Sequence, residues 1–155
     1  MEQTYEIEYK GRIVRCQTAE AATRLLQMLE QEDVAKDTLP WSSRDFMTFT
    51  DRIKLQQRRL LARLLEYGPT TWLSSDKLRS LVGVSGNQAL AGTLSGITKI
   101  AQALDIAPER VYLQTTRFKS GKPDRYYRVA SAFLRAAADH GWPAESDLES
   151  GRNSN

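Results

Sequence analysis

The fold is decided by residues 74–128, which read SSDKLRSLVGVSGNQALAGTLSGITKIAQALDIAPERVYLQTTRFKSGKPDRYYR. Two helical patterns in this stretch are separated by a glycine-containing turn at residues 83–87, and two basic strand-like segments follow around Ser120-Gly121. The second helical pattern is the most regular in the chain. Its apolar residues recur at the spacing of one helix face, and they are Leu90, Leu94, Ile97, Ala101 and Leu104. We therefore expect a helix with a continuous stripe facing the core.

The opposite face of this expected helix carries residues that are small or able to hydrogen-bond, with no carboxylate among them. They are Gln88, Gly92, Ser95, Gly96, Lys99 and Gln102. A glycine inside a helix costs roughly 1 kcal/mol relative to alanine, so Gly92 and Gly96 indicate the close approach of another group. Two groups fit this space equally well, namely a nucleic-acid backbone or base edge and a neighbouring helix.

A basic β-hairpin is expected after the helix. Pro108 disfavours helical backbone at Ala107 and so ends the helix. Residues 111–117 and 125–129 are rich in β-forming residues, and the segment between them has the glycine and proline of a hairpin loop. The strand period of two places Tyr127 and Val129 toward the core and turns Arg128 outward. Between residues 110 and 128 there are six basic residues and one acid.

The order of helix, helix, glycine-containing turn, helix and basic hairpin resembles the winged helix-turn-helix superfamily of DNA-binding domains, over about residues 50–130. The resemblance implies an α+β fold, mainly helical with small β-hairpins. It also implies that the helix after the turn enters the major groove and that the hairpin, the wing of this family, contacts phosphate or minor groove.

The resemblance assigns candidate DNA contacts in three places. Asn87, Gln88, Ser95, Lys99 and Gln102 are the candidates on the groove helix, and Arg117, Lys119, Lys122, Arg125 and Arg128 are those on the wing. Lys77 and Arg79, the exposed cations expected on the preceding helix, complete the set. The groove helix presents one lysine and no arginine on this face, so the bidentate contact of arginine with guanine is not available from it. We expect limited base specificity.

Charge is distributed unevenly along the chain, although the net charge is only +3. Residues 1–43 contain five basic and eight acidic residues, residues 44–135 contain sixteen basic and seven acidic, and residues 136–155 contain one basic and four acidic. The positive charge is thus concentrated on the region that resembles a winged helix. This asymmetry favours a nucleic-acid partner, and an acidic protein partner is the alternative.

The sequence predicts four regions. Residues 1–31 are expected to form a β-hairpin, with its turn at Lys10-Gly11, and a helix capped by Thr18, and 32–42 are expected to be a linker. Residues 43–143 form the winged-helix domain, in which a first helical segment continues or bends at Thr50-Asp51 into a long helix ending at Gly68-Pro69. That long helix carries a basic stripe, expected to be solvated, at Arg52, Gln56, Arg59 and Arg63. A brace helix follows at about 131–140, and residues 144–155 are expected to be disordered.

Several classes of function are disfavoured by the sequence. The chain has one histidine, His140, and one cysteine, Cys16, so a Cys/His metal site within one chain is not available and a serine triad is disfavoured. A pair of carboxylates is the remaining catalytic alternative. The chain has no phosphate-binding P-loop. We therefore expect no enzyme activity, no metal and no cofactor. An apolar run of membrane-spanning length and a signal-peptide pattern are both lacking, which predicts a soluble cytoplasmic protein.

The sequence therefore predicts a duplex-DNA-binding winged-helix protein that acts as a transcriptional regulator or an accessory DNA-binding factor. A homodimer formed through residues 1–31 is expected, since such regulators commonly read paired half-sites. The alternative is a protein-interaction module whose basic face binds an acidic partner. RNA binding is less favoured because no aromatic stacking platform is clustered in the sequence.

Overall fold

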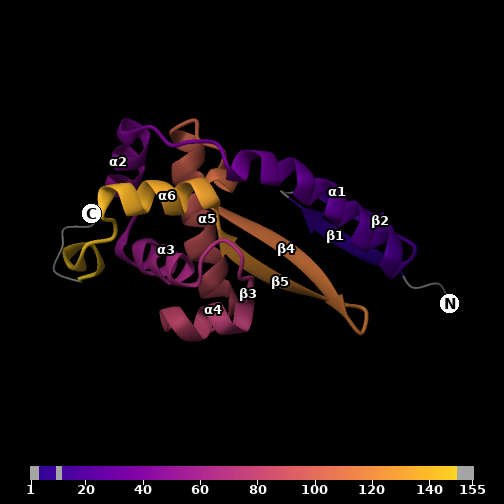
Figure 1. The fold of residues 1–155 in the computed structure, drawn as a ribbon. Helices are drawn as coiled ribbons and strands as arrows, with labels where there is room; N and C mark the ends of the chain where they lie inside the picture. The colour runs from indigo at the N-terminus through magenta and orange to yellow at the C-terminus, as the bar shows by residue number, and fades with distance from the viewer. Residues whose placement is uncertain (1–3, 10–11, 150–155) are drawn as a thin grey trace.

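The computed structural model describes residues 4–9 and 12–149, and it is an α+β structure with six α-helices and two small antiparallel sheets (Figure 1). The side chains of residues 8, 9, 12, 30–35 and 119 are not described. The helices are α1 (Ala19–Asp37), α2 (Ser43–Arg52), α3 (Leu55–Tyr67), α4 (Ser75–Val82), α5 (Asn87–Ala103) and α6 (Ser131–His140). The strands are β1 (Tyr5–Tyr9), β2 (Arg12–Cys16), β3 (Leu73–Ser74), β4 (Tyr112–Lys119) and β5 (Lys122–Val129). Two short 3-10 helices, η1 (Pro108–Arg110) and η2 (Glu145–Leu148), complete the order.

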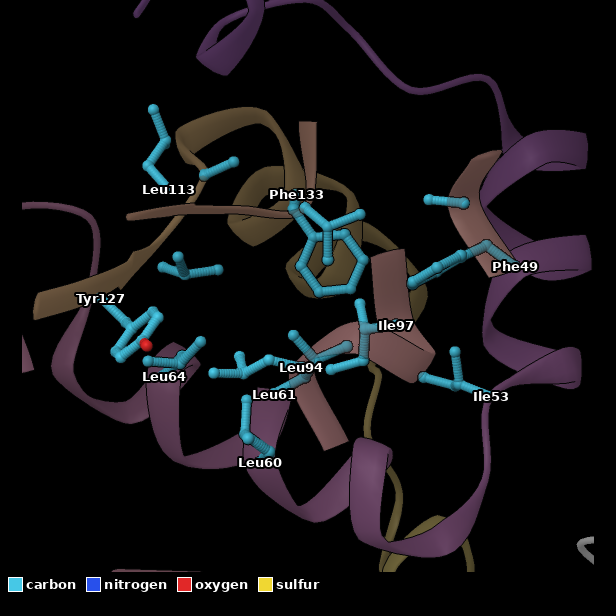
Figure 2. Close-up of a cluster of buried hydrophobic side chains, with 14 of the residues drawn as sticks. Phe49, Ile53, Leu60, Leu61, Leu64, Leu94, Ile97, Leu113, Tyr127 and Phe133 are labelled. Atoms are coloured by element: carbon cyan, nitrogen blue, oxygen red, sulfur yellow. The ribbon is translucent and has the colours of Figure 1, made fainter. Parts of the chain in front are cut away.

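The main core lies between the helices and the sheet of order β3-β5-β4. Figure 2 shows leucines of α3 meeting Ile97 of α5, Phe49 of α2 and Phe133 of α6 in one cluster. The stripe predicted on α5 is confirmed, since Leu90, Leu94, Ile97 and Ala101 are all buried and Leu104 packs against the cluster. Because one face of α5 is anchored along its length, the opposite face is held in a fixed orientation.

Local sequence signals account for the boundaries around α4 and α5. The Ser74 hydroxyl accepts a hydrogen bond from the Lys77 amide at 3.2 Å and caps α4. Helix α4 ends at Gly83, whose φ of +72° lies in the left-handed region. The β4–β5 hairpin turns at Ser120 and Gly121, both with positive φ, in the manner of a two-residue type I′ turn. The predicted basic hairpin is therefore confirmed as a secondary-structure element.

The prediction that Arg128 faces solvent is wrong, because Arg128 is only 8% exposed. Residues paired across neighbouring strands share a face of the sheet, and Arg128 pairs with Leu113 whereas Tyr127 pairs with Gln114. Val111 has helical backbone angles, so the alternation of faces starts only at Tyr112. The face that carries Arg128 is not open, because α1 packs across β4 (Figure 1).

A buried polar junction at Asp37 joins α1 to the sheet and to α6. The Arg128 guanidinium donates from Nη2 to Asp37 Oδ2 at 3.2 Å, and the hydroxyl of Ser131 donates to the same oxygen at 3.2 Å. The backbone N–H of Ser131 donates to the other carboxylate oxygen. The Arg128 guanidinium also lies 5.0 Å from the ring centre of Trp72. Because α1 continues to Asp37 to make these bonds, the predicted linker at 32–42 is helical as far as residue 37, which corrects that boundary.

The N-terminal hairpin and its capped helix are confirmed, with Thr18 accepting from the Ala21 amide at 3.0 Å. The predicted turn at Lys10-Gly11 lies outside the described residues. Ile7, Ala22 and Leu26 form a small apolar cluster, and Phe118 of β4 packs against it. The Tyr5 and Phe118 rings meet edge to face at 5.8 Å. The N-terminal unit therefore packs on the β4–β5 hairpin of its own chain.

Two further boundaries differ from expectation or refine it. Helix α2 bends into α3 at Ile53, whose backbone is extended, rather than at Thr50-Asp51. The tail predicted to be disordered from residue 144 instead forms η2, and the buried Arg58 donates from Nε to the Asp147 carbonyl at 2.6 Å. Arg59, expected on a solvated stripe, donates to the Leu148 carbonyl at 3.2 Å. Residues 150–155 lie outside the described part.

Candidate nucleic-acid interface

The outer face of α5 carries a stripe that is exposed along its length. We call it the α5 exposed stripe and define it by Gln88, Ala91, Gly92, Ser95, Lys99 and Gln102, all of which are exposed. Their spacing puts them on one side of the helix, opposite the buried leucines. No carboxylate occurs anywhere in α5, so nothing on this helix repels a polyanion. The structure thus brings together the predicted contacts Gln88, Ser95, Lys99 and Gln102.

The two glycines of α5 have different explanations. A Cβ at Gly96 would lie 2.3 Å from Nε2 of Gln57 on α3, so this glycine makes room for the Gln57 side chain between the two helices. A Cβ at Gly92 would meet no atom of the described residues within 4 Å. The two alternatives that the sequence left open are therefore separated: packing within the chain accounts for Gly96, while the space over Gly92 is open.

The β4–β5 hairpin places three cations at the surface, of which Arg125 shares the face of Tyr127 whereas Arg117 and Lys122 share the face of Arg128. Arg117, Lys122 and Arg125 are exposed, and the Arg117 guanidinium lies 5.0 Å from the ring centre of Tyr126. The side chain of Lys119 lies outside the described residues, although its backbone pairs with Lys122. Arg128, the fifth predicted contact on the hairpin, is engaged in the Asp37 junction instead. Four of the five predicted wing cations thus belong to the outer part of the hairpin.

Helix α4 contributes less than the sequence suggested. Lys77 is exposed, as predicted. Arg79 forms an ion pair with Asp76, one turn before it, and only 26% of its side chain is exposed. Its charge is therefore partly neutralised within the helix. Asn87, at the first position of α5, is exposed but lies beside the stripe, toward the hairpin.

A groove of about 650 Å³ runs between the start of α5, the hairpin and the N-terminal strands. Asn87 and Ala91 form one side of it, and Thr116 and Arg125 belong to the hairpin side. Its remaining lining includes the carboxylates of Glu6, Asp76 and Asp124. Glu6 is paired with Arg15 at 3.1 Å. The sequence did not reveal this groove, and the one signal that could have indicated it was Phe118, an aromatic residue near the tip of the hairpin.

Two tyrosines of the hairpin, the partly buried Tyr112 and the buried Tyr127, hold it against α5 and α4. The Tyr112 hydroxyl lies 3.0 Å from the Thr98 hydroxyl and donates to the Leu94 carbonyl at 3.5 Å, and both partners belong to α5. Burial raises the pKa of Tyr112 to about 12. Burial also raises the pKa of Tyr127, against the opposing effects of a hydrogen bond with Ser75 and the charge of Arg125. These contacts fix the distance between the α5 exposed stripe and the hairpin.

Other features of the described residues bear on the classes of function that the sequence disfavours, namely metal-dependent enzymes and membrane proteins. Within residues 4–9 and 12–149, no three side chains of His, Cys, Asp or Glu gather as a metal site. In the same part of the chain, no helix is both long and apolar enough to cross a bilayer. His140 stacks on Phe46 with ring centres 4.8 Å apart, and its Nδ1 lies 2.9 Å from the Ala136 carbonyl. Comparison of the chain with protein-family models, curated proteins and solved structures gave no match.

Proposed function

We propose that this chain is a winged-helix protein that binds duplex DNA through the α5 exposed stripe and the β4–β5 hairpin. The observation that carries the proposal is the open, carboxylate-free stripe on α5, with unoccupied space over Gly92. The order α3, β3, α4, α5, β4, β5 supports it, because winged helices have this order of elements. In this arrangement α5 enters the major groove and the hairpin lies along the backbone.

The docking would be largely electrostatic. Five exposed cations lie on α4, α5 and the hairpin: Lys77, Lys99, Arg117, Lys122 and Arg125. If they neutralise about five phosphates, the logarithm of the association constant falls with the logarithm of salt concentration at a slope of about −4 to −5. Gln88 and Gln102, on the stripe, would add hydrogen bonds to base edges. The proposed role is therefore that of a transcriptional regulator or an accessory DNA-binding factor.

A matched pair of charge substitutions tests the proposal. Ser95→Glu puts a carboxylate on the α5 exposed stripe, whereas Gln27→Glu makes the same charge change at an exposed position of α1, outside α5 and the hairpin. Fluorescence-polarisation titrations with a labelled duplex at about 50 to 200 mM salt should show tight binding by the parent chain and by Gln27→Glu. Ser95→Glu should weaken binding by about tenfold or more, since a like charge is placed against phosphate. Circular dichroism checks that both variants are folded.

The dependence of binding on salt concentration tests separately whether the hairpin contacts phosphate. Lys122→Ala should weaken binding to all sequences alike and reduce the slope by about one unit. Absence of binding by the parent chain at 50 mM salt, or equal binding by the two glutamate variants, contradicts the proposal. Polyglutamate serves as a competitor, because the alternative interaction module would prefer an acidic polypeptide to DNA.

We further propose a homodimer that uses the N-terminal unit. Ile13 and Met28 are each 66% exposed on this unit, and burying them against a second copy would be favourable. Light scattering coupled to size exclusion measures the mass of the free protein. A monomer both free and on DNA would remove the dimer from the proposal without affecting DNA binding.

A further inference from the structure

We infer that α5 selects A·T base pairs in the major groove, and this inference rests on the proposed function, in which α5 enters that groove. The residues of a recognition helix that touch base edges come mainly from its N-terminal part. In α5 this part of the exposed stripe consists of Gln88, Ala91, Gly92 and Ser95. The chemistry of these four positions decides which base pairs the helix can favour.

The side chains that recognise only a G·C pair are missing from this part of α5, and Ser95 can pair with either kind of base pair. Guanine is read by arginine or lysine at O6 and N7, and cytosine by a carboxylate that accepts from N4. Helix α5 has no arginine and no carboxylate, and its single lysine is Lys99. Lys99 lies eleven residues after Gln88, or about 16 Å along the helix, which places it toward the edge of the groove. A phosphate is the nearest group for it there.

The side chains that recognise an A·T pair are present. A glutamine amide can pair with N6 and N7 of adenine, and an alanine methyl can pack on the thymine methyl. Gln88 and Ala91 are one turn apart and both exposed, so they can meet neighbouring base pairs. A Cβ at Gly92 would have no neighbour among the described residues within 4 Å, so the backbone can come close enough for these short side chains to reach.

Base analogues test the inference by separating the two grooves. The duplexes share their length and ends and differ in a mixed-order central core of A·T, G·C, inosine·C or A·U pairs. Inosine keeps the major-groove O6 and N7 of guanine but lacks the minor-groove amino group, and uracil lacks the thymine methyl. Competition at one salt concentration should favour the A·T core over the G·C core by about fivefold or more. The inosine core should bind like the G·C core, and the A·U core should fall between.

Gln88→Ala should remove most of the preference for the A·T core, whereas Gln27→Ala, at an exposed glutamine of α1, should leave it unchanged. Equal binding to the A·T and G·C cores overturns the inference and leaves the proposed function standing. An inosine core that binds like the A·T core also overturns it, because the preference would then arise in the minor groove. An unchanged preference in Gln88→Ala refutes the assignment to α5. Failure to bind any duplex at low salt refutes the proposed function, and the inference with it.

Discussion

Gly96→Ala should destabilise the fold through one identifiable contact, although alanine is the better helix former. The new Cβ would lie 2.3 Å from Nε2 and 3.4 Å from Cδ of Gln57, so the amide of Gln57 must retreat by roughly 1 Å. Gln57 is only 8% exposed, and its Oε1 accepts a hydrogen bond from the Lys54 amide at 2.8 Å. The retreat would therefore break the cap at the start of α3.

The expected magnitude combines opposing effects. Alanine stabilises the helix interior by about 1 kcal/mol relative to glycine. Loss of the cap hydrogen bond costs about 1 kcal/mol, and a buried amide left without its partner costs a further 1–3 kcal/mol, roughly. Gly96→Ala should therefore lower the free energy of unfolding by about 1–3 kcal/mol. In a Gln57→Ala background the clash is absent, and the same substitution should raise it by about 1 kcal/mol.

Urea denaturation of the parent chain, the two single variants and the double variant closes a double-mutant cycle. The coupling between Gly96 and Gln57 should be about 2–4 kcal/mol, and the effect of Gly96→Ala should reverse sign between the two backgrounds. An effect of Gly96→Ala that is equal in both backgrounds would refute the assignment of this glycine to packing on α3. Gly96 would then be available as evidence for DNA approach, as Gly92 is.

Three further predictions concern stability. Gly92→Ala should raise the free energy of unfolding by about 0.5–1 kcal/mol while weakening DNA binding in the polarisation assay, and a loss of stability would show that another surface covers this position. Asp37→Ala leaves the buried Arg128 without its carboxylate and should cost about 3–5 kcal/mol in urea denaturation, whereas Asp139→Ala, at an exposed position of α6, should stay within about 0.5 kcal/mol. The folded-state pKa of Tyr112 is raised to about 12, so the stabilisation that its protonated hydroxyl supplies is fully present below pH 10 and is lost as pH rises to 12. The free energy of unfolding should fall over this range by about 1.4 kcal/mol per pH unit. Tyr112→Phe should remove this pH dependence, and an unchanged slope in the variant would contradict the assignment to Tyr112.

Patterns of short range were readable from the sequence. The stripe of α5, the Thr18 cap and the turn at Ser120-Gly121 each depend on residues close together in the chain, and each is confirmed. The errors have a different origin. Arg128 is buried because α1, far away in sequence, covers its side of the sheet, and η2 is ordered because Arg58 reaches the Asp147 carbonyl across the fold.

The candidate site shows the same division. The spacing of Gln88, Ser95 and Lys99 was enough to predict that they share an exposed face. Whether a glycine on that helix meets protein or open space depends on which helix lies beside it, and no pattern within α5 carries that information. Only the placement of Gln57 assigned Gly96 to packing and left Gly92 open. The proposed function draws on the second of these two glycines.

The Asp37 junction also has a consequence for how the chain matures during synthesis. Its carboxylate precedes Arg128 by 91 residues and Ser131 by 94. At ribosomal rates of roughly 5–20 residues per second, the first helix waits about 5–20 s before its partners have been translated. During that interval its carboxylate remains hydrated and α1 lacks the strand β4 on which it packs. A nascent chain arrested between residues 42 and 127 should therefore be sensitive to protease in α1, and protection should begin only when β5 has left the ribosome.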